Sequence, residues 1–377
     1  MKLIKKYTKT AAIINLENLV SNYEEIKKRV NPCKVMAVIK ANAYGHGALQ
    51  IAGKLADAGV DFFAVARMNE AIELLRGGIK EKILIFGRLF PEEIEKSINE
   101  DIRITLTCKE DIEIIDKLAE KLAKPAKIHI NVDTGMGRVG IFPENAIEII
   151  REIAENTNFE IEGIYSHFST SDEKDKSYAI KQLETFNHLL DQIDRIGIEI
   201  PYIHIANSGA MLDIPESYRG KYNMVRAGII LYGYYPSMET SESIFLRQVM
   251  TLRTKVLELR ALPKGYSVSY GRRFITPKAM TIAVLPIGYA DGIHRTFTNN
   301  VIVMIKGKLY PIVGTVTMDQ IMIIVDHSVK VGDEVVFWGE SENGIRKASR
   351  VAEQAGTISY ELCTSVSERV PRIYKKQ

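Results

Sequence analysis

Residues 35–66 read VMAVIKANAYGHGALQIAGKLADAGVDFFAVA, and the fold class can be predicted from this stretch outward. Apolar runs rich in Val, Ile and Phe at 35–39 and 62–66 are typical of buried β-strands. Between them, the apolar residues of 49–58 recur at helical spacing. Two strands joined through a helix are typical of a parallel sheet, so the stretch predicts a β–α–β unit.

The same alternation continues over the first two-thirds of the chain. Eight strands alternating with helices predict a parallel sheet, and eight is the number that closes a (β/α)8 barrel of the TIM type. An open, doubly wound sheet is the alternative. The predicted strands cover 35–39, 62–66, 83–86, 103–107, 127–132, 161–166, 202–206 and 223–231. The predicted helices cover 16–30 (capped by Asn15), 49–58, 92–100, 109–122, 146–155 and 178–195.

The pattern changes after about residue 240, where short strands follow one another without helices between them. We therefore predict two domains: a barrel over 10–240 and a mostly β domain over 241–377, with residues 1–14 as a segment that also pairs with the second domain. The predicted strands of this region are 249–259, 280–286, 301–305, 322–326 and 333–337, and its predicted helix is 348–355.

The overall composition excludes several classes of partner. The 377 residues include 50 basic and 47 acidic side chains, a net charge of +3, which favours neither a nucleic acid nor a membrane. No apolar run approaches the roughly 18 residues of a membrane span. Cys33, Cys108 and Cys363 are widely spaced and odd in number, which fits a reducing cytoplasm and indicates no metal cluster.

Lys40 stands where a predicted strand ends and a loop of small residues begins. In a barrel, side chains at the carboxyl ends of the strands face the active site. A partly desolvated lysine there has a lowered pKa and can form an imine with a carbonyl compound. From this segment alone, a solvated lysine at the end of a strand is an equal alternative.

Further motifs follow Lys40 in order along the chain. They stand at 40–47 (KANAYGHG), 133–140 (DTGMGRVG), 165–168 (YSHF), 206–208 (ANS), 225–229 (VRAGI), 269–271 (SYG), 288–292 (GYADG), 318–320 (MDQ), 358–361 (ISYE) and 370–372 (VPR). Each is weak by itself, but the ordered set covers nearly the whole chain and resembles the alanine racemase family. The segment 40–47 is similar to the family motif of the lysine that carries pyridoxal 5′-phosphate (PLP).

The resemblance implies a barrel followed by a β domain, a head-to-tail homodimer, and active sites that take residues from both subunits. It implies that Lys40 carries PLP as a Schiff base and that Tyr270 of the second subunit acts on the opposite face of the cofactor. The implied cofactor-binding residues are Lys40, Tyr44, Arg138, His167, Asn207, Ser208, Arg226, Gly228, Ile229 and Tyr360. Arg138 and Met318 are implied to bind the substrate, and Tyr289, Arg295 and Asp172 to line the entrance.

Two of these residues carry a physical argument. Tyrosine has an unperturbed pKa near ~10, so Tyr270 needs assistance to act as a base, and His167 and Arg226 match the neighbours that supply it in the family. Arg226 would face the pyridine nitrogen of PLP. Because arginine keeps its proton, that nitrogen would accept a hydrogen bond without becoming protonated, which weakens the electron sink and limits transamination.

Asn131 departs from the family pattern, in which many members have a carbamylated lysine at this position. Strand alternation places His129, Asn131 and Asp133 on one face, which we expect to point into the barrel. An amide cannot be carbamylated, and we expect Arg138 to be buried and to need a partner. The resulting hypothesis is a chloride ion between Asn131 and Arg138.

The leading prediction is racemisation of L- and D-alanine that supplies D-alanine for peptidoglycan. The alternatives are a broader racemase acting on serine or basic amino acids, a non-catalytic PLP-binding barrel, and a decarboxylase of the same architecture. The residues at the entrance and Asn131 bear on the first alternative. The long second domain with Tyr270 and Met318 argues against the second, and Cys363, in a segment similar to the racemase pattern, argues against the third.

Overall fold

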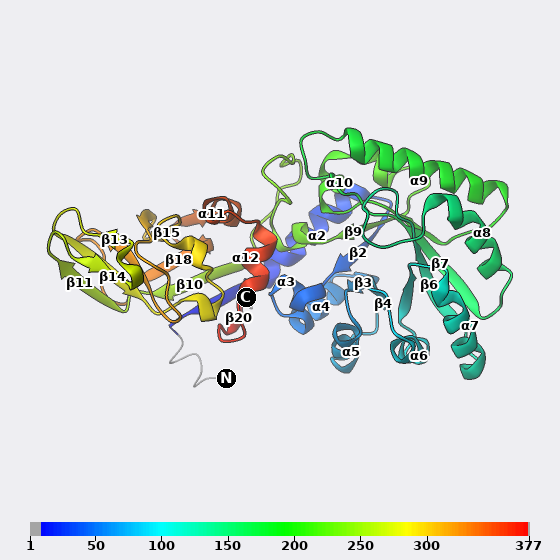
Figure 1. Cartoon of the computed structure of the whole chain (residues 1–377), viewed down its shortest axis with the longest axis horizontal. Coiled ribbons are helices and arrows are strands. Elements are labelled where there is room, and N and C mark those ends of the chain that lie inside the picture. The colour runs from blue at the N-terminus through cyan, green and yellow to red at the C-terminus, as the bar shows by residue number, and fades with distance from the viewer. Residues whose placement is uncertain (1–8, 376–377) are drawn as a thin grey trace.

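The computed structural model describes residues 9–375 and confirms a parallel eight-stranded barrel followed by a mostly β region (Figure 1). The barrel strands pair in the order β8-β7-β6-β5-β4-β3-β2-β9. The barrel is nearly closed, since Asn223 and Arg226 donate backbone hydrogen bonds to Ile203 (3.2 Å) and Ala206 (3.0 Å) beside β8. The strands are β2 (Lys34–Val38), β3 (Phe62–Val65), β4 (Lys82–Ile85), β5 (Arg103–Leu106), β6 (Ala126–Asn131), β7 (Phe159–Tyr165), β8 (Tyr202–His204) and β9 (Met224–Ala227).

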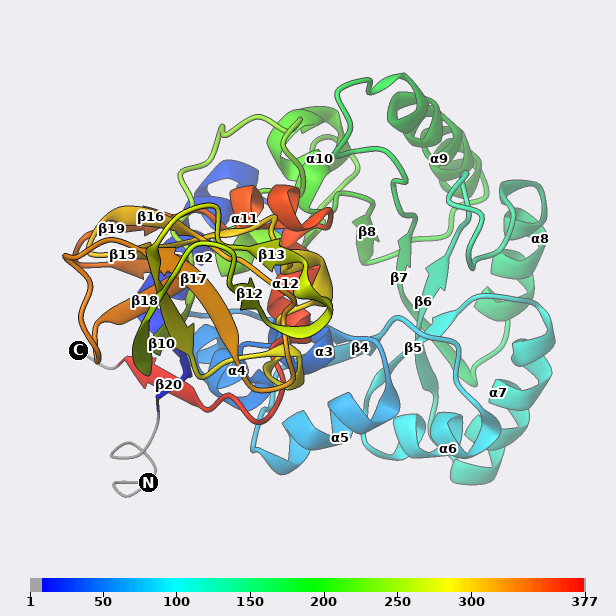
Figure 2. The ribbon, with the colours of Figure 1, turned by 60° about the vertical axis from the view of Figure 1, so that its left-hand side comes forward.

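Amphipathic helices surround these strands (Figure 2). The first of them, α2, begins where predicted, because the Asn15 side chain accepts from the backbone amides of Glu17 and Asn18 and so satisfies two free donors. The barrel helices are α2 (Leu16–Val30), α4 (Ala48–Asp57), α5 (Met68–Arg76), α6 (Pro91–Asn99), α7 (Glu110–Leu122), α8 (Pro143–Ala154), α9 (Ser177–Arg195) and α10 (Ser208–Asp213). Of these, α5 and α10 were not predicted.

Two predicted strands are wrong in extent. The strand expected over 223–231 ends at Ala227, and the chain turns at Gly228 into a 3₁₀ helix, Ile229–Tyr232. The strand expected over 249–259 divides into β10 (Met250–Lys255) and β11 (Glu258–Leu262). The division occurs because the amide of Val256 bonds to Asp333 while the next amide, that of Leu257, bonds to Val284, so the chain passes from one sheet to another.

The second region contains two main sheets. One has the order β16-β15-β18-β10-β1-β20, with β19 beside β18, and the other the order β11-β14-β17. In the first, β1 (Ala11–Asn15) pairs with β10 and with β20 (Arg372–Lys375), so residues near both ends of the chain lie in one sheet. Residues 1–14 were predicted to pair with the second domain as well, and of these residues 1–8 lie outside the described residues. The other elements are β12 (Ser267–Val268), β13 (Phe274–Ile275), β14 (Met280–Leu285), β15 (Ile302–Ile305), β16 (Lys308–Pro311), β17 (Ile321–Val325), β18 (Glu334–Ser341), β19 (Gly344–Arg346), α11 (Ala348–Ala355) and α12 (Ser359–Ser365).

The two regions share a continuous apolar core. Phe62 and Phe63 are fully buried in the barrel, and Phe337 and Trp338 in the β region. The short α3 (Lys40–Tyr44) packs against α12, which lies between the two regions (Figure 1). Across residues 9–375, no helix has both the length and the apolar character that crossing a membrane requires.

Candidate active site

A cavity of about 400 Å³ opens at the carboxyl ends of the barrel strands. It brings together residues from β2, β6, β7, β9 and the loops after them, as the position of active sites in such barrels leads one to expect. Eleven residues of the sequence-based prediction line it: Lys40, Tyr44, Asn131, Arg138, His167, Asn207, Ser208, Arg226, Gly228, Ile229 and Tyr360.

Lys40 begins a left-handed turn. The four residues that follow it, Ala41 to Tyr44, all have φ between 51° and 54°, which non-glycine residues rarely adopt in succession. Glu70 of α5 accepts from the amide of Ala41 at 2.6 Å, and the ring Nδ1 of His46 lies 2.8 Å from the carbonyl oxygen of Tyr44. These contacts hold the turn so that the side chains of both Lys40 and Tyr44 reach the cavity.

The environment of Lys40 favours its neutral amine. Burial lowers the pKa of Lys40, and the charges of Arg138 and Arg226 lower it further, whereas Glu70 opposes them. The neutral amine is the form that attacks a carbonyl carbon. Lys40 is therefore suited to hold an aldehyde cofactor.

Arg226 of β9 is buried in the wall of the cavity. Its Nη1 donates to His204 Nδ1 at 2.9 Å, and its Nη2 donates to the Ser166 carbonyl at 2.8 Å and to His167 Nδ1 at 3.1 Å. No described residue accepts from Nε–H, which leaves this donor for a ligand. Burial lowers the pKa of Arg226 to about 10, so the guanidinium stays charged at neutral pH.

A cradle suited to a phosphate lies beside Gly228. A Cβ at this position would lie 2.8 Å from Tyr44 Oη and 3.4 Å from Ser208 Oγ, so only glycine leaves the hydroxyls open. The Gly228 amide donates to Ser208 Oγ at 3.2 Å. Asn207, rather than Ser208, caps α10, because its side chain accepts from the Ala210 amide. Hydroxyl and amide donors around one glycine fit the phosphate of PLP.

Four predicted residues lie on the other domain, away from this cavity. Thr315 donates to the Tyr270 carbonyl at 2.7 Å. In the loop after Thr315, the Thr317 carbonyl accepts from the Tyr289 amide at 3.0 Å, and the Met318 carbonyl accepts from the Ala290 amide at 3.1 Å. One loop thus gathers Tyr270, Tyr289 and Met318 on a single surface, where Tyr270 is 75% exposed. Arg295 lines a separate depression beside Arg273. Asp172 does not line the cavity either. Burial raises the pKa of Tyr360, and the charge of Asp172 raises it further.

The expected burial of Arg138 is wrong. Asn131 is buried at the end of β6 and lines the cavity as strand alternation predicts, but Arg138 is exposed on the loop that follows. Water therefore hydrates the guanidinium of Arg138 in the single chain, and the argument that it needs a buried anionic partner no longer holds.

Comparison with known proteins agrees with this geometry. The family model described as "Alanine racemase, N-terminal domain" matches residues 14–236, and "Alanine racemase, C-terminal domain" matches residues 249–374. The chain belongs to the alanine racemase family. This is a family of PLP-dependent isomerases, and the chain carries both of its domains rather than a barrel alone.

Individual alanine racemases are similar to this chain along almost their entire length. "Alanine racemase 2" of Caldanaerobacter subterraneus subsp. tengcongensis is 44% identical, over 97% of this chain and 94% of the relative. The alanine racemase of Methanococcus maripaludis is 45% identical, over 96% of this chain and 98% of the relative. Among solved structures, the alanine racemase of Clostridium difficile 630 has a TM-score of 0.90 at 40% identity, over 98% and 96%. That of Bartonella henselae, described with covalently bound pyridoxal phosphate, has a TM-score of 0.88 at 30% identity, over 98% and 100%.

Several residues that shape the racemase-like cavity were not predicted. Glu70 lies on the unpredicted helix α5, and it accepts from Ala66 and Arg67 as well as from Ala41. A helical pattern with an acidic residue in its first turn was the available signal. His204 and Glu162 point into the barrel, and their contacts depend on neighbouring strands, so no local pattern indicates them.

Proposed function

We propose that this chain catalyses the interconversion of L- and D-alanine with PLP held by Lys40. The observation that carries the proposal is the cavity in which a desolvated lysine faces a charged arginine and a cradle of hydroxyl and amide donors. Lys40, Arg226 and the cradle formed by Tyr44, Ser208 and Gly228 would hold the cofactor. When bound, PLP supplies an electron sink that makes the α-proton of an amino acid removable.

We propose a two-base mechanism. Lys40 moves the proton on one face of the substrate, and the partner subunit's Tyr270 moves it on the other. Support comes from the exposure of Tyr270 on its own chain, which leaves it free for a second copy of this chain. His167 also supports the assignment. Because its Nδ1 accepts from Arg226, its proton lies on Nε2, which is a donor suited to stabilise a phenolate.

Arg226 would favour racemisation over transamination. Its guanidinium keeps its proton, so it donates a hydrogen bond to a ring nitrogen without transferring charge to it. With PLP bound, this would weaken the electron sink and so disfavour transamination.

A small substrate fits this proposal, with Arg138 and the partner subunit's Met318 amide as binding groups for its carboxylate. Tyr289, Arg295, Tyr360 and Asp172 are proposed to line the entrance. Asn131, which replaces a lysine of many family members, favours a second candidate function, a racemase of broader specificity. Turnover of L-alanine, L-serine and L-lysine, measured side by side, separates the two. Comparable kcat/KM values for all three would favour the broader enzyme.

The variant Tyr270→Phe tests the mechanism. We expect it to keep bound PLP while exchange of the α-proton with solvent collapses for only one enantiomer, by roughly the 10²- to 10⁴-fold that a general acid or base contributes. Exchange of each enantiomer is followed by NMR in D₂O. Unchanged exchange in both directions would refute the two-base mechanism.

We keep the chloride ion between Asn131 and Arg138 as a proposal with its own test. The buried amide of Asn131 is a donor at the cavity wall, and Arg138 stands on the loop that follows β6. A crystal soaked in bromide is expected to give an anomalous peak between the two side chains. Water alone at that position would rule the ion out.

The cellular role follows from the proposed product. D-Alanine is a precursor of peptidoglycan, and we propose that the enzyme supplies it in the cytoplasm as a homodimer with shared active sites. Cys33, Cys108 and Cys363 are all free thiols, which is consistent with a reducing compartment.

A further inference from the structure

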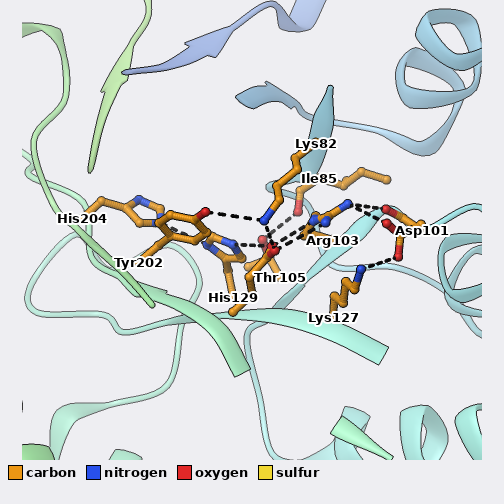
Figure 3. Close-up of polar contacts among 10 residues, drawn as sticks. Lys82, Ile85, Asp101, Arg103, Thr105, Lys127, His129, Tyr202 and His204 are labelled. Carbon is orange, nitrogen blue, oxygen red and sulfur yellow. Dashed lines mark hydrogen bonds and ion pairs between the residues drawn. The ribbon is translucent and has the colours of Figure 1, made fainter. Parts of the chain in front are cut away.

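A chain of buried polar side chains runs through the barrel from the cavity wall, and Figure 3 shows its members His204 and His129 beside Arg103 and Lys82. It starts at Arg226, whose Nη1 lies 2.9 Å from His204 Nδ1. His204 Nε2 lies 3.0 Å from His129 Nδ1, and His129 Nε2 lies 3.5 Å from Glu162 Oε2. Each of these four residues is at most 4% exposed, so water does not compete for the contacts.

The donors and acceptors of this chain have one consistent direction. Arginine has only donors, so His204 Nδ1 must accept and the proton of its ring lies on Nε2. His204 Nε2–H then donates to His129 Nδ1, which places the proton of His129 on Nε2, facing the Glu162 carboxylate. Burial lowers the pKa of both imidazoles, which keeps each ring neutral with a single proton at pH 7.

The far end of the chain is anchored by charge. Glu162 accepts from Arg103 Nε at 2.8 Å and from Lys82 Nζ at 2.5 Å. Burial alone would raise the pKa of Glu162, but the approach of His129 and the hydrogen bonds from Arg103 and Lys82 hold it well below the usual range. Glu162 therefore remains a carboxylate, which can only accept.

Aromatic rings fix the orientation of both imidazoles. His204 stacks on Tyr165 with centroids 4.9 Å apart and an interplanar angle of 10°. His129 stacks on Tyr202 at 13°, with centroids 6.2 Å apart. The Arg226 guanidinium lies over the ring of Tyr165, 5.0 Å from its centroid. The rings therefore allow little rotation, and the proton positions decide whether the chain is attractive or repulsive.

We propose that His129 and Glu162 are positioning residues for Arg226: they fix the tautomer of His204 and thereby hold the guanidinium in the wall of the cavity. If Glu162 did not accept from His129, the His129 proton could move to Nδ1. His204 would then accept at Nε2 and carry its proton on Nδ1, facing another donor on Arg226. That reversal would push the guanidinium out of place. The catalytic consequence rests on the proposed racemisation, whereas the proton positions do not.

Neutron diffraction from crystals of the holoenzyme grown in D₂O tests the proton positions directly. We expect deuterium on Nε2 and none on Nδ1 of both His129 and His204. Deuterium on Nδ1 of either ring would overturn the proposal. This readout needs no variant and no measurement of activity, so it decides the question even if the variants below do not fold.

Two variants of His129 separate positioning from packing. His129→Leu removes the acceptor for His204, and we expect kcat for alanine to fall about 10-fold or more while KM changes less than about 2-fold, as for supporting residues around an active group. His129→Gln is expected to recover kcat to within about 3-fold, because its amide oxygen can accept from His204 and its amide nitrogen can donate to Glu162. Equal losses in both variants, or no loss in His129→Leu, would overturn the proposal.

Asp101→Asn is the matched control. Asp101 binds Arg103 at 3.2 Å and Lys127 at 2.8 Å at the same end of the barrel, but it does not contact the two histidines. We expect its kcat to be unchanged, and a loss as large as that of His129→Leu would assign the effect to the charge cluster and overturn the proposal. If the unaltered enzyme does not racemise any amino acid, the proposed function fails, while the neutron result still decides the tautomers.

Discussion

The residues after Lys40 adopt a conformation that costs free energy. Ala41, Asn42, Ala43 and Tyr44 are all left-handed, and each non-glycine residue pays roughly 1–2 kcal/mol for this. The side chains of Glu70 and Asn42 offset the cost by accepting from the amides of Ala41 and Ala48. The turn is therefore stabilised by its neighbours rather than by its own residues, and it keeps Lys40 beside Tyr44.

Ala41→Gly tests this cost. Ala41 is exposed and has φ 52°, which glycine adopts freely, so we expect the free energy of unfolding to rise by about 1 kcal/mol. Urea unfolding measures the change. Ala56→Gly, in the right-handed helix α4, is the control and should lose about 0.5–1 kcal/mol. A loss for Ala41→Gly of the same size would show that the turn is not strained.

His46 makes stability depend on pH. Burial lowers the pKa of His46 from 6.5 to about 4, so the folded protein binds this proton less readily than the unfolded chain does. The contribution of His46 to the free energy of unfolding is complete above pH 6.5 and is lost as the pH falls toward 4, at up to about 1.4 kcal/mol per pH unit.

In His46→Gln we expect a shallower fall of the unfolding free energy between pH 6.5 and 4.5. Urea unfolding at four pH values measures it, with the exposed His188→Gln as control. Equal slopes for His46→Gln and the unaltered protein would contradict the assignment.

At the scale of elements, the end of the chain holds the turn that carries Lys40. Arg372 of β20 donates from Nε to the Gly45 carbonyl at 2.9 Å, and Tyr374 donates to the His46 carbonyl at 3.2 Å. A Cβ at Gly45, which has φ 79°, would lie 2.2 Å from the Cys363 carbonyl of α12. Two elements of the β region are thus in direct contact with the turn that carries Lys40.

Arg372→Met should loosen this turn. It removes the donor to Gly45 together with the donors to the Val366, Ser367 and Val370 carbonyls, so we expect a loss of about 2 kcal/mol in the free energy of unfolding. Hydrogen–deuterium exchange should rise at residues 40–47. Arg350→Met is the control, since Arg350 makes an exposed pair with Glu353. Unchanged exchange at 40–47 would show that β20 does not hold the turn.

At the scale of the whole molecule, the cavity and the surface with Tyr270 belong to different domains. Lys40 lines the cavity, whereas Tyr270 is 75% exposed on the β region and does not line it. A second copy of the chain can bring the two together, and a two-fold symmetric dimer would do so twice. Activity should therefore depend on mixing subunits.

Mixing two inactive variants tests this dependence. A dimer of one Lys40→Ala and one Tyr270→Phe subunit has one site with both groups intact and one with neither. After unfolding and joint refolding at equal amounts, half of the dimers are mixed, so we expect about a quarter of the unaltered activity. Activity equal to the mean of the separate variants would show that Tyr270 serves its own chain.

Sequence patterns predicted the alternating strands and helices, the β region and most of the residues that line the cavity, and the structure shows that the eight strands form a nearly closed barrel. Apolar periodicity marks strands and helices because it reflects local burial, and the ordered motifs indicated Lys40, Arg226 and Gly228. The tertiary structure alone decided the left-handed turn at Ala41, the exposure of Arg138 and the chain from His204 to Glu162. These depend on contacts between segments far apart in sequence: Glu70 supports the turn, and strands from different parts of the barrel place the histidines within hydrogen-bond distance. No local pattern contains that information, because the free energy that selects each conformation comes from the neighbouring segment.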